Sequence, residues 1–361
     1  MVSLRKTLSL VSHRLSGGIC FAPMIAAALL SVPLTSAVAE QTTLTYAGYG
    51  GALQKAEEAG WLNPYMKENP DIKIIYDNVD YAKLKAMVES GDVVWDLATT
   101  AGDFGLKKDE VLLEKIDCTI VPCSKMQPDK FQTTGYRVPH QTSGVVLGYN
   151  TAKMPEGKKP EGWADFFDLQ KFPGKRVVMM DYSSYVFEQA LAADGVDSKS
   201  LYPLDFDRAI KKLNSLGNNI IVAPSYQGCA ELVASGEAVM GGCWYGRLDD
   251  VKLRAGAPVE IQWNQCVAAP GYLVIPKGTK HKDEVMKLVA YITSAEHNAD
   301  PTAFIPYGPV NVGALEKVKP EIAPRVISSH LDQCIYPDDG WYDNNKEEVN
   351  KRWTEWVSGM N

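Results

Sequence analysis

The sequence predicts an α/β protein with two lobes. Apolar, β-branched segments alternate with amphipathic segments along most of the chain, as they do in largely parallel sheets flanked by helices. The chain has 361 residues, more than one hydrophobic core usually supports. Polar and aromatic residues follow the expected strands, and ligands of open α/β sheets bind beyond the carboxyl ends of strands. We therefore expect two lobes whose strand ends face a common cleft.

The first 39 residues have the order of a secretory signal peptide. Arg5, Lys6 and Arg14 make a basic start, an apolar stretch follows, and the small residues at 37–39 form a cleavage motif. Cleavage after Ala39 would leave 361 − 39 = 322 residues. We therefore expect an exported, periplasmic protein.

The charge of the chain limits the partners that we expect. The whole chain has a formal net charge of −7, and the leader carries three basic and no acidic residues, so the mature chain has −7 − 3 = −10. An acidic protein is repelled by nucleic acid and by anionic membranes. No apolar run after the leader is long enough to span a bilayer. We expect a monomer that binds a small-molecule solute and no nucleic acid.

Strand and helix patterns alternate over the first third of the mature chain. Tyr49, Gly50 and Gly51 stand where the first strand gives way to a helix. Glycine adopts the dihedrals that a tight turn needs, and backbone N–H groups at a helix start attract polar groups of a ligand. The expected elements are strands at 43–47, 72–78 and 95–100, helices at 51–70 and 81–91, and a turn at 102–110.

The alternation resumes after a solvated loop at residues 154–162, which is rich in proline, glycine and lysine and is typical of the edge of a lobe. Val349, Trp353 and Trp356 share one face of a C-terminal amphipathic helix at 344–359. The other expected elements are strands at 143–149, 175–181, 219–225 and 238–244, helices at 183–195, 205–217 and 228–237, and a strand, turn and helix over 271–294.

The residues after these strands suit a ligand cleft, although each has a structural alternative. Asp181 could cap the helix that follows it, and Asp103 could serve as a turn residue. Arg247 could pair with Asp249 or Asp250 on a solvated surface. The candidates at the strand ends are Tyr49, Gly50, Gly51, Asp103, Asp181, Tyr185, Trp244 and Arg247.

Six cysteines remain after the leader, and an even number in an exported protein indicates disulfides. Proximity favours Cys118 with Cys123 and Cys229 with Cys243, which leaves Cys266 with Cys334. Six cysteines allow 15 pairings, so the sequence alone leaves the choice open. A zinc site is the alternative, but the spacings fit no standard zinc finger.

No pattern in the chain indicates catalysis. The sequence contains no nucleophile elbow, no P-loop and no metal-binding histidine pair. The carboxylates are scattered, and no pair has a spacing that imposes general acid–base geometry. We therefore expect a binding protein without enzymatic activity, cofactor or metal.

Segments spread over the whole mature chain resemble one family. They include TYAGYGGALQKAEEAG, WDLATTAGDFGLKKDEVLLEKID, VVMMDYSSYVFEQAL, VMGGCWYGRLDDVKLRAGAPVEIQW and IPYGPVN. In their order and spacing they resemble the periplasmic solute-binding proteins of ABC importers, and within them the spermidine/putrescine-binding branch. The resemblance implies two lobes of type II-like topology that close on a solute and then dock on a membrane permease. It implies lobe 1 at residues 40–148 and 272–318 and lobe 2 at 149–271 and 319–361.

The resemblance also implies roles for some cleft residues. Polyamine binders use aromatic walls and acidic groups, because a cation is attracted to aromatic faces and to carboxylates. Trp244 and Tyr307 match aromatic positions of the family, and Asp181 matches an acidic one. Thr142 lies beside the expected crossover between the lobes, near the cleft. A polyamine-type amine is therefore the first ligand class that we expect.

Other positions depart from the family pattern. Tyr185 stands where the family has a second acid, and residues 269–271 replace a tryptophan and an aspartate. Asp103 could restore one of the missing acidic contacts, whereas Arg247 suits a carboxylate better than a diamine. A zwitterionic or carboxylate-bearing amine is thus the alternative ligand. A ferric-ion binder, with Tyr185 and Tyr245 as ligands, is a further alternative.

Overall fold

The computed structural model describes residues 41–127, 129–181 and 184–360. The expected signal peptide and its cleavage after Ala39 lie outside the described residues. Within these ranges, no helix is long and apolar enough to cross a membrane.

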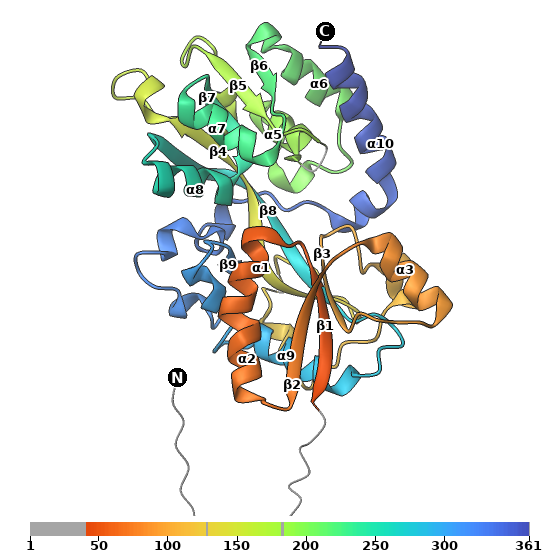
Figure 1. The fold of residues 1–361 in the computed structure, drawn as a ribbon. Coiled ribbons are helices and arrows are strands. Elements are labelled where there is room, and N and C mark those ends of the chain that lie inside the picture. The colour runs from red at the N-terminus through yellow and green to blue at the C-terminus, as the bar shows by residue number, and fades with distance from the viewer. Residues whose placement is uncertain (1–40, 128, 182–183, 361) are drawn as a thin grey trace, which may run out of the picture. The chain divides into compact units, whose positions relative to one another are not determined.

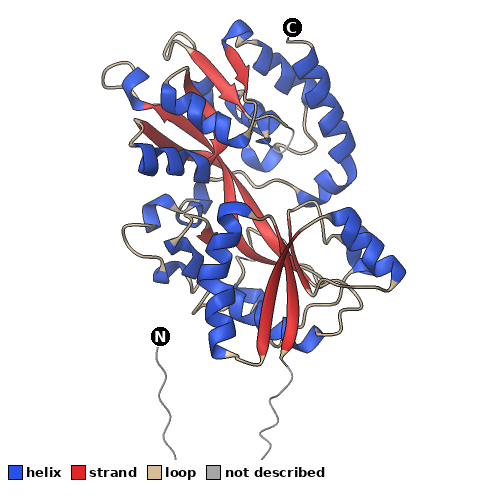
Figure 2. Ribbon diagram, in the orientation of Figure 1, coloured by secondary structure: helices blue, strands red, loops and turns tan. Residues whose placement is uncertain are grey.

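One mixed sheet runs through the described part of the chain (Figures 1 and 2). Its strands follow the order β2-β1-β3-β8-β4-β7-β5-β6, and β9 pairs with β4. The strands are β1 (Thr42–Gly48), β2 (Ile72–Asn78), β3 (Leu97–Thr100), β4 (Val138–Asn150), β5 (Lys175–Val178), β6 (Ile220–Val222), β7 (Ala238–Trp244), β8 (Val259–Val274) and β9 (Gly308–Pro309).

The sheet contains two groups of parallel strands. In one group β1 pairs with β2 and β3, and in the other β5 pairs with β6 and β7. The long strands β4 and β8 pair with each other in antiparallel register, and they join the groups through the pairs β3–β8 and β4–β7 (Figure 1). The α/β fold with two groups of parallel strands is as expected. The lobe boundaries stay a prediction.

Helices cover the sheet, as the amphipathic patterns indicate (Figure 2). The helix expected at 51–70 is present as α1, one π-helical stretch at Glu58–Leu62, and α2. The α-helices are α1 (Gly51–Glu57), α2 (Asn63–Glu68), α3 (Tyr81–Ser90), α4 (Trp163–Phe167), α5 (Val186–Ala193), α6 (Phe206–Asn214), α7 (Tyr226–Ser235), α8 (Tyr245–Ala255), α9 (Lys282–Thr293) and α10 (Asp339–Ser358).

Several expected strand boundaries were wrong. β4 begins at Val138 rather than at residue 143, because the register irregularity between Pro139 and Gln141 accommodates the proline. β8 likewise begins at Val259, well before residue 271, and includes Pro270. β5 ends at Val178 rather than at residue 181, so the polar residues after it belong to a connecting segment.

The core and the cysteine pairs agree with the sequence. Val349, Trp353 and Trp356 of α10 are buried, as the shared face predicts. The structure contains the three disulfides that proximity favours, Cys118–Cys123, Cys229–Cys243 and Cys266–Cys334. The last of these links β8 to a segment whose Ile335 pairs with Val267, close to where β4 and β8 join the two parallel groups.

Candidate functional site

Two adjoining cavities lie at the carboxyl ends of the parallel strands. The larger cavity has a volume of about 1050 Å³ and the smaller one about 540 Å³. Both are lined by Tyr49, which follows β1, and by Tyr226, the first residue of α7. Because they share these residues, we describe them as two compartments of one candidate site.

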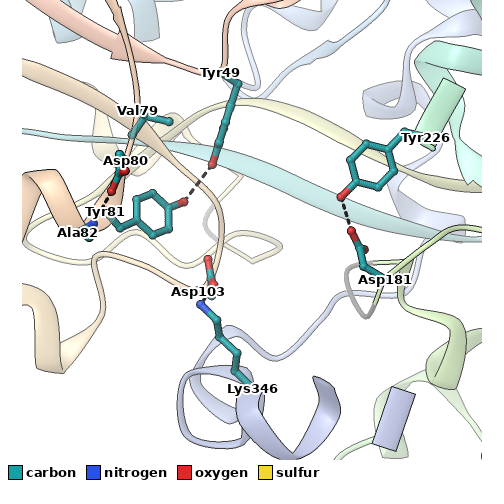
Figure 3. A pocket seen from close by; sticks show the side chains of 9 residues that line it. All are labelled: Tyr49, Val79, Asp80, Tyr81, Ala82, Asp103, Asp181, Tyr226 and Lys346. Atoms are coloured by element: carbon teal, nitrogen blue, oxygen red, sulfur yellow. Dashed lines mark hydrogen bonds and ion pairs between the residues drawn. The ribbon is translucent and has the colours of Figure 1, made fainter. Parts of the chain in front are cut away.

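The smaller cavity is lined by three carboxylates, Asp80, Asp103 and Asp181 (Figure 3). Asp80 caps α3 by accepting from the Ala82 and Lys83 N–H groups at 2.8 and 3.0 Å. Lys346 Nζ of α10 lies 2.6 Å from Asp103 Oδ2. The hydroxyl of Tyr226 donates to Asp181 Oδ2 at 2.6 Å. Asp103 follows β3 and Asp181 follows β5, so strand ends of both parallel groups contribute to this cavity.

A pair of tyrosines lines the smaller cavity beside Asp103 (Figure 3). The hydroxyls of Tyr49 and Tyr81 lie 3.0 Å apart, and the Tyr81 hydroxyl accepts a hydrogen bond from the Ala101 N–H at 2.8 Å. Burial, followed by the charge of Asp103, raises the pKa of Tyr81 to about 12. Tyr81 is therefore neutral near pH 7, and it holds the hydroxyl of the half-exposed Tyr49.

Aromatic rings form a wall of the larger cavity. Trp244, the last residue of β7, meets Tyr226 edge to face with ring centroids 6.4 Å apart. Tyr307 lies so close to Gly246 that a Cβ at this glycine would come within 2.9 Å of the ring. Tyr185 also lines this cavity. Such rings can cover an ammonium group or an alkyl chain of a solute.

The larger cavity also contains a cation without a carboxylate partner. In the described part of the chain, Arg247 of α8 forms no ion pair, whereas Asp249 makes a bidentate pair with Arg325 at 2.9 and 2.6 Å. Asp250 pairs with Arg254. The surface pairing considered for Arg247 is therefore not what the structure contains.

Arg247 shares the larger cavity with other polar groups. Arg247 and Tyr307 both line the larger cavity, and the charge of Arg247 opposes the rise in the Tyr307 pKa that burial causes. The Gln141 side chain is almost fully buried, and its Oε1 has no hydrogen-bond partner within the described residues. The Arg247 guanidinium suits a carboxylate of a solute, whereas Gln141 Oε1 is an acceptor and suits a hydrogen-bond donor.

The glycine turn after β1 has the expected geometry. Gly50 and Gly51 have φ values of 72° and 64°, a region that favours glycine. The Gly50 N–H donates to the Tyr76 hydroxyl at 3.4 Å, so this amide has a partner in the protein. Both glycines line the larger cavity.

Most of the predicted site residues line the two cavities. Thr142 is the exception: it is fully buried in β4 and lines neither cavity. Tyr245, a ferric-ion ligand in the third alternative, also lines neither and donates its hydroxyl to the Pro306 carbonyl. Contact with a solute stays a prediction for every candidate. The smaller cavity is lined by Tyr49, Asp103 and Asp181, and the larger by Tyr49, Gly50, Gly51, Tyr185, Trp244, Arg247 and Tyr307.

Sequence reasoning missed several lining residues. Tyr226 lies in a strand-end segment, which is a signal that was available. Lys346 and Arg325 follow no strand end, so the sequence gives no such signal for them. They lie far along the chain from their partners Asp103 and Asp249, and only the folded chain brings them together. The missed residues include Tyr81, Gln141, Tyr226, Arg325 and Lys346.

The chemistry of the site is that of binding. Among residues 41–127, 129–181 and 184–360, no group of three or more His, Cys, Asp and Glu side chains could hold a metal ion. The site combines carboxylates, a guanidinium and aromatic rings, which together bind polar, charged solutes.

Comparison with a family model defines the class of protein. Residues 60–326 match the bacterial extracellular solute-binding proteins. The chain belongs to this family. It is thus a solute-binding protein of the kind that serves ABC importers, and the proteins it resembles are not enzymes.

Three known proteins are similar to this chain over most of its length. The γ-aminobutyric acid-binding protein of Pseudomonas aeruginosa is 29% identical over 334 residues, which cover 90% of this chain and 93% of that protein. The spermidine/putrescine-binding periplasmic protein of Escherichia coli is 25% identical over 77% of this chain and 80% of its own. The solved structure of a γ-aminobutyric acid receptor is 36% identical with a TM-score of 0.79, and covers 87% of this chain and 97% of that one.

Proposed function

We propose that the chain is the periplasmic substrate-binding component of an ABC importer for a small solute that carries both an ammonium and a carboxylate group. The observation that carries this proposal is Arg247, a guanidinium that lines the larger cavity without a carboxylate partner in the described residues. Guanidinium groups bind carboxylates with two parallel hydrogen bonds. A carboxylate of the solute would complete the pairing of Arg247.

The other end of such a solute would meet acidic and aromatic groups. The rings of Tyr49 and Tyr226 line both cavities, and Asp181, which accepts a hydrogen bond from Tyr226, lines the smaller one. An ammonium gains from a nearby carboxylate and from aromatic faces. The γ-aminobutyric acid-binding relatives have names that fit a solute of this type.

Binding would proceed by hinge closure. β4 and β8 are the long strands that join the two parallel groups, and residues of both groups line the smaller cavity. A solute that contacts both sides stabilises the closed state by its differential affinity for that state. The closed protein would then deliver the solute to the permease in the inner membrane. We further propose cleavage after Ala39 and a monomer that binds no nucleic acid.

A polyamine is the second candidate solute. Asp103 and Asp181 both line the smaller cavity, and paired acids suit the two ammonium ends of a diamine. The spermidine/putrescine-binding relative supports this candidate by its name.

A thermal-shift screen tests the proposal. The mature protein would be unfolded and refolded under oxidising conditions, to remove carried-over solute and keep the disulfides. The panel would contain γ-aminobutyrate, putrescine, spermidine, basic and neutral amino acids, and ferric citrate. A ligand that binds only the folded state raises Tm by mass action. We expect γ-aminobutyrate or a related amino acid to raise Tm; a shift with putrescine and spermidine alone would favour the second candidate.

A further inference from the structure

The ammonium group of Lys346 is already paired with one carboxylate of the candidate site, that of Asp103. Lys346 Nζ lies 2.6 Å from Asp103 Oδ2, and the two residues are 243 positions apart in the sequence. Both line the smaller cavity (Figure 3). The Asp103 side chain is only 21% exposed and that of Lys346 43%. This ion pair is thus partly shielded from water and faces the space where a solute would bind.

The helix that carries Lys346 is held firmly on both sides of the site. Asp339, the first residue of α10, accepts from Arg137 Nη2 at 2.7 Å and from the Tyr272 hydroxyl at 3.0 Å. Tyr342 donates to the buried carboxylate of Glu188 at 2.5 Å. These contacts fix the backbone of α10, so the Lys346 side chain starts from a defined position close to Asp103.

A tethered ammonium competes with any second ammonium that a solute offers. The lysine is present at high effective concentration because it belongs to the same molecule. A diamine that reached Asp103 would have to displace Lys346 and would then lie beside a like charge, which is unfavourable. A zwitterion needs only one acid, and Asp181 supplies it while Lys346 stays in place.

From this geometry we propose that Lys346 is a specificity-determining residue that disfavours diamines by occupying Asp103. The proposal rests on the proposed function, since it concerns the same site. It assigns to Lys346 an effect on selectivity between solutes and not on the fold.

The test compares γ-aminobutyrate with putrescine, which have the same four-carbon chain and differ in one end group. Calorimetric titrations would use the stripped wild-type protein, Lys346→Gln and the double variant Lys346→Gln/Asp103→Asn. We expect Lys346→Gln to improve putrescine affinity relative to γ-aminobutyrate by at least about fivefold, the scale of a partly exposed ion pair. The double variant should lose this gain, because the freed carboxylate is gone.

Lys108→Gln is the matched control. Lys108 pairs with Asp343 of the same helix but lines neither cavity, so its loss also removes an α10 contact while leaving the site untouched. An unchanged ratio in Lys108→Gln, with a ratio shifted toward putrescine in Lys346→Gln, supports the proposal, and a shift toward γ-aminobutyrate in Lys346→Gln contradicts it. Equal changes in both variants, or a loss of both ligands in Lys346→Gln, would mean that Lys346 acts through the fold and would overturn it.

The same data separate this proposal from the proposed function. If the wild type binds γ-aminobutyrate and Lys346→Gln leaves the ratio unchanged, the role of Lys346 fails and the proposed function stands. If the wild type binds neither ligand but Lys346→Gln binds putrescine, the role of Lys346 stands and the zwitterion fails. If no protein in the series binds either ligand, both proposals are overturned.

Discussion

The two cavities of the candidate site differ in how their charged side chains are paired. In the smaller cavity Asp103 is paired with Lys346, and Asp181 accepts from Tyr226. In the larger cavity Arg247 has no carboxylate partner among the described residues, although two aspartates follow it in the same helix and are paired elsewhere. One compartment thus has its strongest charges satisfied by the protein, and the other leaves a charge for the solute.

This difference means that the pairing of a few side chains, rather than the fold, decides which solute charges the site can take. Carboxylates at strand ends favour cationic solutes. The ion pair with Lys346 neutralises one of these carboxylates, that of Asp103. A guanidinium left without a partner then creates a place for an anion. Variants that remove these charges one at a time test the difference between the two cavities.

The largest effect is expected for Arg247→Ala. Loss of a charge-assisted contact should weaken γ-aminobutyrate binding by about 2–3 kcal/mol and leave putrescine nearly unchanged, as calorimetry can measure. Arg254→Ala is the control, because Arg254 lines the same cavity but already pairs with Asp250. Equal losses for both solutes in Arg247→Ala would reject a carboxylate-specific role.

A smaller loss is expected for Trp244→Ala. If the indole covers the solute where the cavities meet, its removal should weaken binding of either solute type by about 2 kcal/mol. Trp244→Phe keeps a ring and should recover much of the affinity. Unchanged affinity in calorimetric titrations of the alanine variant would remove Trp244 from the site.

The substitution Glu188→Gln tests a buried carboxylate whose partners are two tyrosine hydroxyls rather than a cation. Glu188 is fully buried and accepts from Tyr202 at 2.8 Å and Tyr342 at 2.5 Å. Burial raises the pKa of Glu188, and the hydrogen bonds from Tyr342 and Tyr202 lower it by less. A raised pKa means that the folded state binds the proton more tightly than the unfolded state does. The stability from this group is therefore fully present below its ordinary pKa and is lost as pH rises through the folded-state value.

The measurement is Tm as a function of pH. As pH rises, the wild type should lose on the order of 1 kcal/mol of folding stability for each unit by which the Glu188 pKa is raised. Glu188→Gln has no carboxylate to titrate and should not show this loss. Glu237→Gln, at an exposed position, serves as the control. An identical pH profile for Glu188→Gln and the wild type would contradict the raised pKa.

The smallest effect is expected for Tyr49→Phe. The Tyr49 hydroxyl is within hydrogen-bond distance of Tyr81, so the ring rather than the hydroxyl would contact the solute. Affinity should change by no more than about 0.5 kcal/mol. A larger loss in the same titrations would mean that the hydroxyl binds the solute directly.

The parts of the site that lie at strand ends could be predicted from the sequence. The ends of apolar runs located Asp181 and Trp244, although β5 itself stops at Val178. The positive φ values of Gly50 and Gly51 explain why glycine stands at those two positions. These are local relations between residue type and backbone, and a sequence displays them directly.

The pairing of charges could not be predicted. Asp249 was considered as a partner of Arg247 because it is near in sequence, but residues two apart in a helix point in different directions. Its real partner, Arg325, is 76 positions away, and Lys346 is 243 positions from Asp103. Only the fold brings such residues together, and these pairs decide which charges remain for a ligand.

A single titration series tests whether the site is built for one ammonium and one carboxylate. The stripped wild-type protein would be titrated by calorimetry with γ-aminobutyrate, and with butylamine, butyrate and putrescine, which each alter one end of the same chain. We expect γ-aminobutyrate to bind and each of the other three to bind at least about tenfold more weakly, a difference of about 1.4 kcal/mol. Putrescine binding as tightly as γ-aminobutyrate, or more tightly, would contradict a site built for one ammonium and one carboxylate.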